Sequence, residues 1–113
     1  MAATGIDILT IGLTASATIA QFQPVQATGA PATAAGNAVG FARIGAASGE
    51  RVPVTVQGTT VAIAGAAITA GSLVEVHTTV TQVVTKAAGV SIGRALTAAT
   101  QAGDQIEVLI LPN

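Results

Sequence analysis

Residues 35–56, AGNAVGFARIGAASGERVPVTV, and residues 88–110, AGVSIGRALTAATQAGDQIEVLI, repeat one pattern. The two stretches share paired glycines, a Gly-acid turn and three alternating β-branched residues, which align as Gly36/Gly89, Gly40/Gly93, Gly49-Glu50/Gly103-Asp104, Val52/Ile106, Val54/Val108 and Val56/Ile110. Each stretch predicts a short apolar strand, an Ala- and Gly-rich turn and a strand with alternating faces. Two such units predict a small all-β domain with two similar strand–turn–strand halves.

Turn signals divide the rest of the chain into further short strands. The expected strands cover residues 17–27, 38–44, 51–57, 60–64, 73–77, 82–85, 91–97 and 105–111. Short strands at this spacing are typical of a β-sandwich or barrel. The Ala-rich segments 64–70 and 97–102 are expected to form one helical turn each at most, because short isolated helices are marginal.

Residues 1–16 form an apolar lead that belongs to neither repeated stretch. We expect an N-terminal extended segment here, either an arm or an extra strand of the core. Residues 17–113 are expected to form a single β-rich domain, since a chain of 113 residues suits one domain.

The strand at 51–57 should point Val52, Val54 and Val56 inward and Thr55 outward. Pro53 predicts that this strand lies at a sheet edge, because proline cannot donate to a ladder.

The last strand is apolar on both faces. Ile106, Val108 and Ile110 lie on one face, and Leu109 and Leu111 lie on the other. A strand with two apolar faces must be covered on both sides, and in a domain this small we expect another chain to cover the second face.

Composition excludes several classes of function. Four basic and five acidic residues give a net charge of −1, whereas nucleic-acid binding needs clustered Lys and Arg. Without cysteine, the chain can form neither a disulfide framework nor a thiolate metal site. The uncharged stretch 52–73 contains Pro53 and alternates with period two, so we expect no membrane span. The N-terminus lacks the features of a secretory signal, which favours synthesis in the cytosol.

The polar residues do not suggest catalysis. His77, the only histidine, and Glu75 are expected on the outer face of the strand at 73–77. Asp104 lies in a turn, where Asp is favoured for backbone hydrogen bonds, and Glu107 lies on the polar side of a strand. Glu50 occupies the turn equivalent to that of Asp104, which favours a backbone role for both. We therefore expect no enzyme, no cofactor and no metal site.

A nucleotide phosphate loop is also excluded. Such a loop requires Lys and Ser/Thr after its second glycine, because these side chains contact phosphate and magnesium. Gly40 and Gly45 have the glycine spacing, but Ala46 and Ala47 follow.

The order and spacing of several short fragments resemble a family of tailed-phage head-decoration, or capsid cement, proteins, often labelled RecA/RadA-like recombinases. The fragments are 32–36, 39–42, 47–54, 67–74, 92–96 and 102–110. The resemblance covers about residues 17–113. It implies a β-rich domain on the exterior of the phage head, commonly a homotrimer between major capsid proteins.

Two functions follow as expectations. The first is a structural cement protein of the virion that binds the outer surface of the head and stabilises contacts between major capsid proteins. The alternative is a non-catalytic surface- or carbohydrate-binding module of a phage fibre. Apolar residues outside the expected core are the candidates for contacting the capsid or a second molecule: Ile6, Ile8, Leu9, Ile11, Leu13, Leu109 and Leu111.

Overall fold

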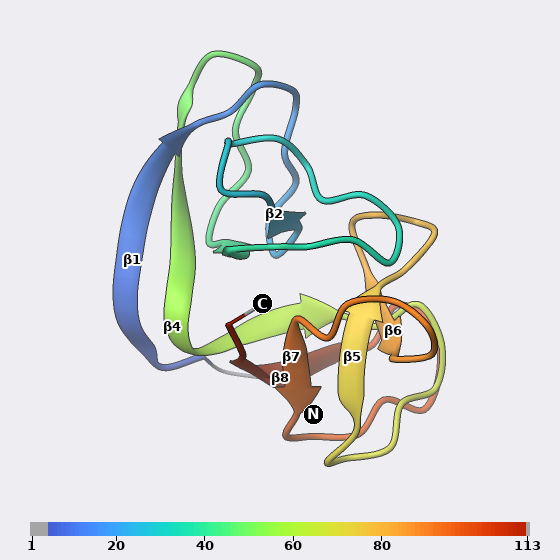
Figure 1. Cartoon of the computed structure of the whole chain (residues 1–113). Coiled ribbons are helices and arrows are strands. Elements are labelled where there is room, and N and C mark those ends of the chain that lie inside the picture. Colours follow the sequence, from blue (N-terminus) through green and yellow to red (C-terminus); the bar gives the residue numbers. More distant parts are fainter. Residues whose placement is uncertain (1–4, 113) are drawn as a thin grey trace.

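The structure is a computed structural model that describes residues 5–112, all of them in strands, turns and loops (Figure 1). The strands are β1 (Asp7–Thr14), β2 (Pro24–Val25), β3 (Gly40–Ala42), β4 (Arg51–Ile63), β5 (Leu73–Val76), β6 (Val83–Thr85), β7 (Gly93–Ala95) and β8 (Gln105–Ile110). The all-β prediction is confirmed. Within residues 5–112 there is no helix of the length and apolarity needed to cross a membrane. The Ala-rich segments 64–70 and 97–102 contain no helical turn, and Ile68 and Ala99 join them in an antiparallel bridge.

The eight strands form one curled sheet of antiparallel pairs. The order is β2-β3-β4-β8-β7-β5-β6, and β1 pairs with β4 beside this path. Figure 1 shows β4 running along β1, then bending to continue beside β8. The strand expected at 17–27 is reduced to β2 and a bridge between Ile19 and Ala46.

β4 is a single strand of 13 residues, where the sequence predicted two strands at 51–57 and 60–64. Its first part pairs with β1 and its second part pairs with β8. Gly58 lies between the two parts with φ 98°. Glycine tolerates this conformation, which other residues rarely adopt, so the glycine lets the strand continue where a turn was expected.

The prediction that Pro53 marks a sheet edge is wrong. Pro53 pairs with Gly12 of β1 on one side, and on the other its carbonyl oxygen accepts from the Arg43 amide at 2.9 Å. The N and O atoms of a strand residue point to the same side, so the missing N–H faces Arg43 and not β1. Gln21 supplies the replacement donor, because its Nε2 donates to the Arg43 carbonyl oxygen at 3.1 Å.

The repeat is longer than the sequence alignment indicated. β2 and β3 pair in the same register as β5 and β7, and β1 pairs with the start of β4 as the end of β4 pairs with β8. For example, Thr14–Arg51 corresponds to Ile63–Gln105. The first half (residues 5–57) and the second half (residues 59–112) are therefore two versions of one fold. We call residues at the same register position counterparts.

Residues 1–16 were expected to lie outside both repeats, and for the described part of this segment that prediction is wrong. β1 is the counterpart of the end of β4, and the Ala15 amide and the Ala64 amide make equivalent bonds to the carbonyl oxygens of Glu50 and Asp104, both 2.8 Å long. Residues 1–4 lie outside the described residues.

Each half buries its own core at equivalent positions. The first-half core consists of seven buried residues, and every one has a buried counterpart: Ala15/Ala64, Ile19/Ile68, Val25/Val74, Ala42/Ala95, Ala46/Ala99, Val52/Ile106 and Val54/Val108. The second-half core also contains Phe41, which the first half contributes. Phe41 therefore joins the two halves.

Two polar residues expected on the outside are buried. Thr55 is 0 % exposed, and its Oγ1 donates to Asp7 Oδ1 at 3.2 Å. It pairs with Phe41 in the sheet, so it shares the face that the second half covers. Glu75 is buried because the chain at 87–89 returns over it, and its Oε1 accepts from the amides of Ala87 (2.5 Å) and Gly89 (3.2 Å).

Candidate interaction surface

The outer edge of β1 is an open sheet edge. Within residues 5–112, β1 pairs with β4 alone. Because the Pro53 carbonyl faces β3, the paired Gly12 directs its own N–H and C=O away from β4. An unpaired edge of this kind is a template for another strand.

The start of β1 and the residue before it expose large apolar side chains. Ile6 is 69 % exposed, Ile8 is 74 % exposed and Leu9 is 45 % exposed. The register shifts on both sides of Leu9 leave Ile8 without a partner residue in β4. Ile11 and Leu13 instead pack against the first-half core. The structure therefore divides the five N-terminal candidates into three exposed residues and two core residues.

Polar bonds fix the exposed segment in place. The Asp7 carboxylate forms an ion pair with Arg43 Nε at 2.9 Å and accepts from Thr55. The Ile6 amide donates to Thr59 Oγ1 at 2.8 Å, and the Thr59 amide donates to the Ile6 carbonyl oxygen at 2.9 Å. Ile6 and Ile8 are thus presented by an anchored backbone.

The two C-terminal candidates have different surroundings. Leu109 of β8 is 37 % exposed, and Leu96, which is 44 % exposed, follows the neighbouring strand β7. Leu111 is half-buried and lines a cavity.

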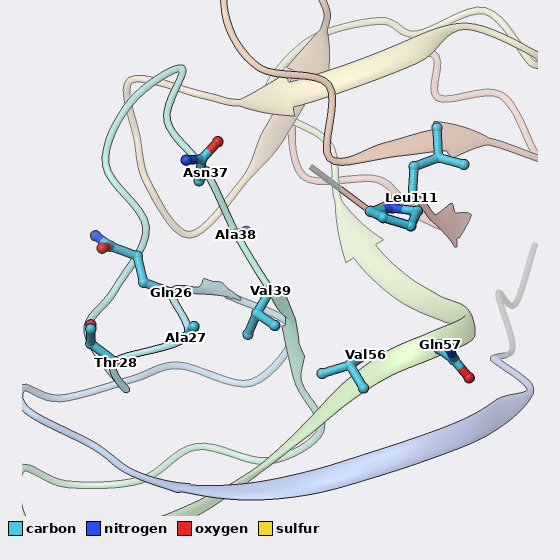
Figure 2. Close-up of a pocket in the computed structure, with 10 residues that line it drawn as sticks. Gln26, Ala27, Thr28, Asn37, Ala38, Val39, Val56, Gln57 and Leu111 are labelled. Atoms are coloured by element: carbon cyan, nitrogen blue, oxygen red, sulfur yellow. The ribbon is translucent and has the colours of Figure 1, made fainter.

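That cavity, of about 500 Å³, lies beside the first-half core (Figure 2). Its apolar wall includes Val39 and Val56, which pack against that core. The lining residues come from four separate segments: Gln26, Ala27, Thr28, Asn37, Ala38, Val39, Val56, Gln57, Leu111 and Pro112. This cavity was not predicted from the sequence. The repeat offered one signal for it: Val39 and Val56, which line the cavity, align with the larger residues Ile92 and Ile110.

The acids of the two equivalent turns hold the backbone, as predicted. Glu50 Oε1 accepts from the Ala47 amide at 2.7 Å. Asp104 Oδ2 accepts from the amide and the hydroxyl of Thr100, both at 2.9 Å. These hydrogen bonds, the one from the amide foremost, lower the pKa of Asp104.

The remaining polar candidates are not brought together. His77 Nδ1 accepts from the Thr79 amide at 3.0 Å, and Glu107 Oε2 accepts from Thr59 Oγ1 at 2.8 Å. No three His, Asp or Glu side chains between residues 5 and 112 are grouped as a metal site would need. The surface of the molecule thus offers apolar contacts and a cavity as its main binding features.

A family model described as "phage cement protein" matches residues 2–110. The chain belongs to this family. Cement proteins are structural components of the phage head, so the chain has a structural role in capsid decoration.

A solved structure has the same fold. The crystal structure of the head fiber gp8.5 N base of bacteriophage phi29 matches with a TM-score of 0.72 and 16 % identity, over 91 % of this chain and 93 % of that chain. No curated protein sequence matches the chain. The cement-family resemblance inferred from the sequence is confirmed.

Proposed function

We propose that the chain, synthesised in the host cytoplasm, binds the exterior of a phage head as a homotrimer and stabilises contacts between major capsid proteins. The observation that carries this proposal is the exposed apolar segment Ile6–Leu9 on an open strand edge. Family membership supports association with the head.

Apolar burial is the main source of binding energy available to this surface. The whole chain has nine charged side chains of nearly balanced sign, and long-range attraction between so few charges is weak. Burying one Ile side chain contributes about 1.5–3 kcal/mol. The unpaired backbone of β1 adds a second mode, because an edge strand can extend a sheet of its partner.

A matched pair of substitutions tests this surface. Ile8→Asp places a charge in the apolar segment, and Ile44→Asp places the same charge at another isoleucine, which is 56 % exposed. Both variants and the unmodified protein are mixed with heads that lack the protein, and bound protein is measured by co-sedimentation. We expect Ile8→Asp to weaken binding at least tenfold and Ile44→Asp to leave it within twofold.

Equal binding by both variants would contradict the proposed surface. Salt provides a second readout: raising it to about 1 M shortens the screening length to about 3 Å, and binding by apolar contact should change little. A large loss of binding in salt would favour an electrostatic surface instead.

We also propose that the protein has no catalytic activity. His77→Ala should leave head binding and virion stability unchanged, since the hydrogen bond that the His77 ring accepts from the Thr79 amide is local. A variant that folds normally but loses function would contradict this.

The fibre-module alternative predicts binding to cell-surface sugars rather than to heads. Sugar sites commonly stack their ligands on Trp or Tyr, and this sequence contains neither. Binding to host cells with no binding to heads would favour that alternative. Sedimentation analysis of the free and head-bound protein tests the trimer.

A further inference from the structure

The second-half core is closed by residues from the first half. Ile92 and Ile110 are 1 % and 8 % exposed. The first-half residues in the same core are Ala32, Ala38 and Phe41. Ala35 holds this cover in place, because its amide donates to the Val76 carbonyl oxygen at 2.9 Å and its carbonyl oxygen accepts from the Val90 amide at 3.0 Å.

In the first half the equivalent cover is incomplete: the second half contributes Leu111 and Pro112, and a cavity remains. Val39 and Val56, the counterparts of Ile92 and Ile110, are only partly buried and line the cavity of about 500 Å³. Ala27, the counterpart of the buried Val76, is exposed. The cavity (Figure 2) therefore lies in the first half at a position whose equivalent in the second half is filled by apolar side chains of the first half.

The second half has the reverse feature, a sheet face that stays exposed within residues 5–112 and carries Glu107 as well as apolar side chains. Phe41 and Thr55 of the first half are both 0 % exposed. Their counterparts Arg94 and Leu109 are exposed, and Leu109 is paired with Arg94 in the sheet, so both lie on one face. Leu96, two residues after Arg94, adds a second exposed leucine to this face.

We infer that, in the homo-oligomer proposed above, the cavity of one molecule receives the Leu96–Leu109 face of the next. The contact is head to tail: an open cavity on the first half meets an uncovered face on the second half. Repeats commonly need a neighbour to bury their apolar faces, and contacts between two different surfaces close into rings when the rotation allows it.

A second molecule of this chain suits the cavity on two grounds. Three large hydrophobic residues outside the β1 segment are exposed among residues 5–112, namely Ile44, Leu96 and Leu109, and two of them lie on the face in question. The polar side chains around the cavity are neutral, with amide groups on Gln26, Asn37 and Gln57. Their carbonyl oxygens can accept from the guanidinium of an incoming Arg94 without a repelling charge.

Because the chain has no cysteine, single cysteine variants give a direct test. Val56→Cys and Leu109→Cys are prepared separately, mixed and oxidised, both in solution and on heads. Denaturing electrophoresis then separates cross-linked from free chains. We expect a dimer band in the mixture and little or none with either variant alone. Mass spectrometry of that band should find a disulfide that joins the thiol introduced by Val56→Cys to the thiol introduced by Leu109→Cys.

A charge substitution gives an independent readout that involves no cross-link. Val39→Asp should shift the oligomer to monomer in sedimentation, whereas Ile44→Asp should leave the oligomer intact. Circular dichroism must show that both variants are folded.

The inference rests on the proposed self-association, and its failure can be distinguished from failure of the proposed function. Self-linking of Leu109→Cys alone would show a two-fold contact and overturn the head-to-tail arrangement. Head binding without the mixed disulfide would overturn this inference and leave capsid decoration standing. Monomers in solution and on heads would overturn both the inference and the proposed trimer.

Discussion

The two halves of the molecule share their backbone pairing and differ in what covers them. Phe41 and Arg94 occupy the same register position, opposite Thr55 and Leu109, yet Phe41 is buried and Arg94 is exposed. The difference follows from position within the chain: the second half covers this face of the first half, whereas the counterpart face of the second half stays exposed within residues 5–112. The same strand pairing therefore forms a buried face in the first half and an exposed face in the second half.

Deleting residues 1–16 should have the largest effect, because it breaks the equivalence of the halves. It removes β1, together with Ala15 of the first-half core and the packing of Ile11 and Leu13. We expect a loss above about 5 kcal/mol, comparable with the whole stability of a small domain. Circular dichroism and urea unfolding measure it. A truncated protein with an unchanged unfolding midpoint would show that β1 is a separable arm.

Phe41→Ala and Arg94→Ala should sharpen the contrast between counterparts. Removing the buried Phe41 ring should lower the unfolding free energy by about 3–5 kcal/mol. Removing the exposed Arg94 side chain, which donates to the Gly71 carbonyl oxygen at 2.8 Å, should cost less than about 1 kcal/mol. Equal losses in urea unfolding would mean that Phe41 does not join the halves.

Ile19→Ala and Ile68→Ala test where the halves agree. These counterparts are 1 % and 2 % exposed, and each bridges to an alanine of its own half. Each substitution should cost about 2–5 kcal/mol, and the two losses should agree within about 1 kcal/mol. Unfolding followed by two probes should remain a single transition. Two separate transitions, each shifted by one substitution, would show that the halves unfold independently.

Asp104→Asn should have the smallest effect, and one that depends on pH. Hydrogen bonds from Thr100 lower the pKa of Asp104 in the folded state, so its contribution is present above the unfolded pKa, about 4. The contribution is lost as the pH falls through the lower, folded pKa. The variant should therefore be less stable than the unmodified protein at pH 7 and converge with it in acid. Glu50→Gln in the equivalent turn is the matched comparison, and a difference that is constant with pH would contradict this role of Asp104.

The sequence revealed the repeat where backbone geometry restricts residue choice. Gly49 and Gly103 have φ 88° and 92°, so the turns retain glycine in both halves. Upstream, Phe22 has φ 67° where its counterpart Gly71 has φ 91°, and this exchange hides the correspondence. Strand positions need only alternate burial, and for that reason β1 and the end of β4 share almost no residues.

The candidate surface was predicted only in part. Hydrophobicity identified the β1 residues, but the exposure of Leu9 and the partial burial of Leu13 depend on how β1 pairs with β4. The cavity joins segments as distant as Gln26 and Pro112, and no local pattern contains that information. Glu75 was misplaced for a similar reason, since the chain that covers it returns from residues 87–89.

The continuity of β4 has a mechanical consequence. Besides the contacts of Phe41 and Ala35, a force that pulls the two halves apart is carried by one covalent strand, from its ladder with β1 to its ladder with β8. Hydrogen bonds loaded parallel to a strand must break together, whereas those loaded at one end break one after another. Each half is therefore attached to the other by one continuous strand. Tension along that strand loads the hydrogen bonds of both ladders.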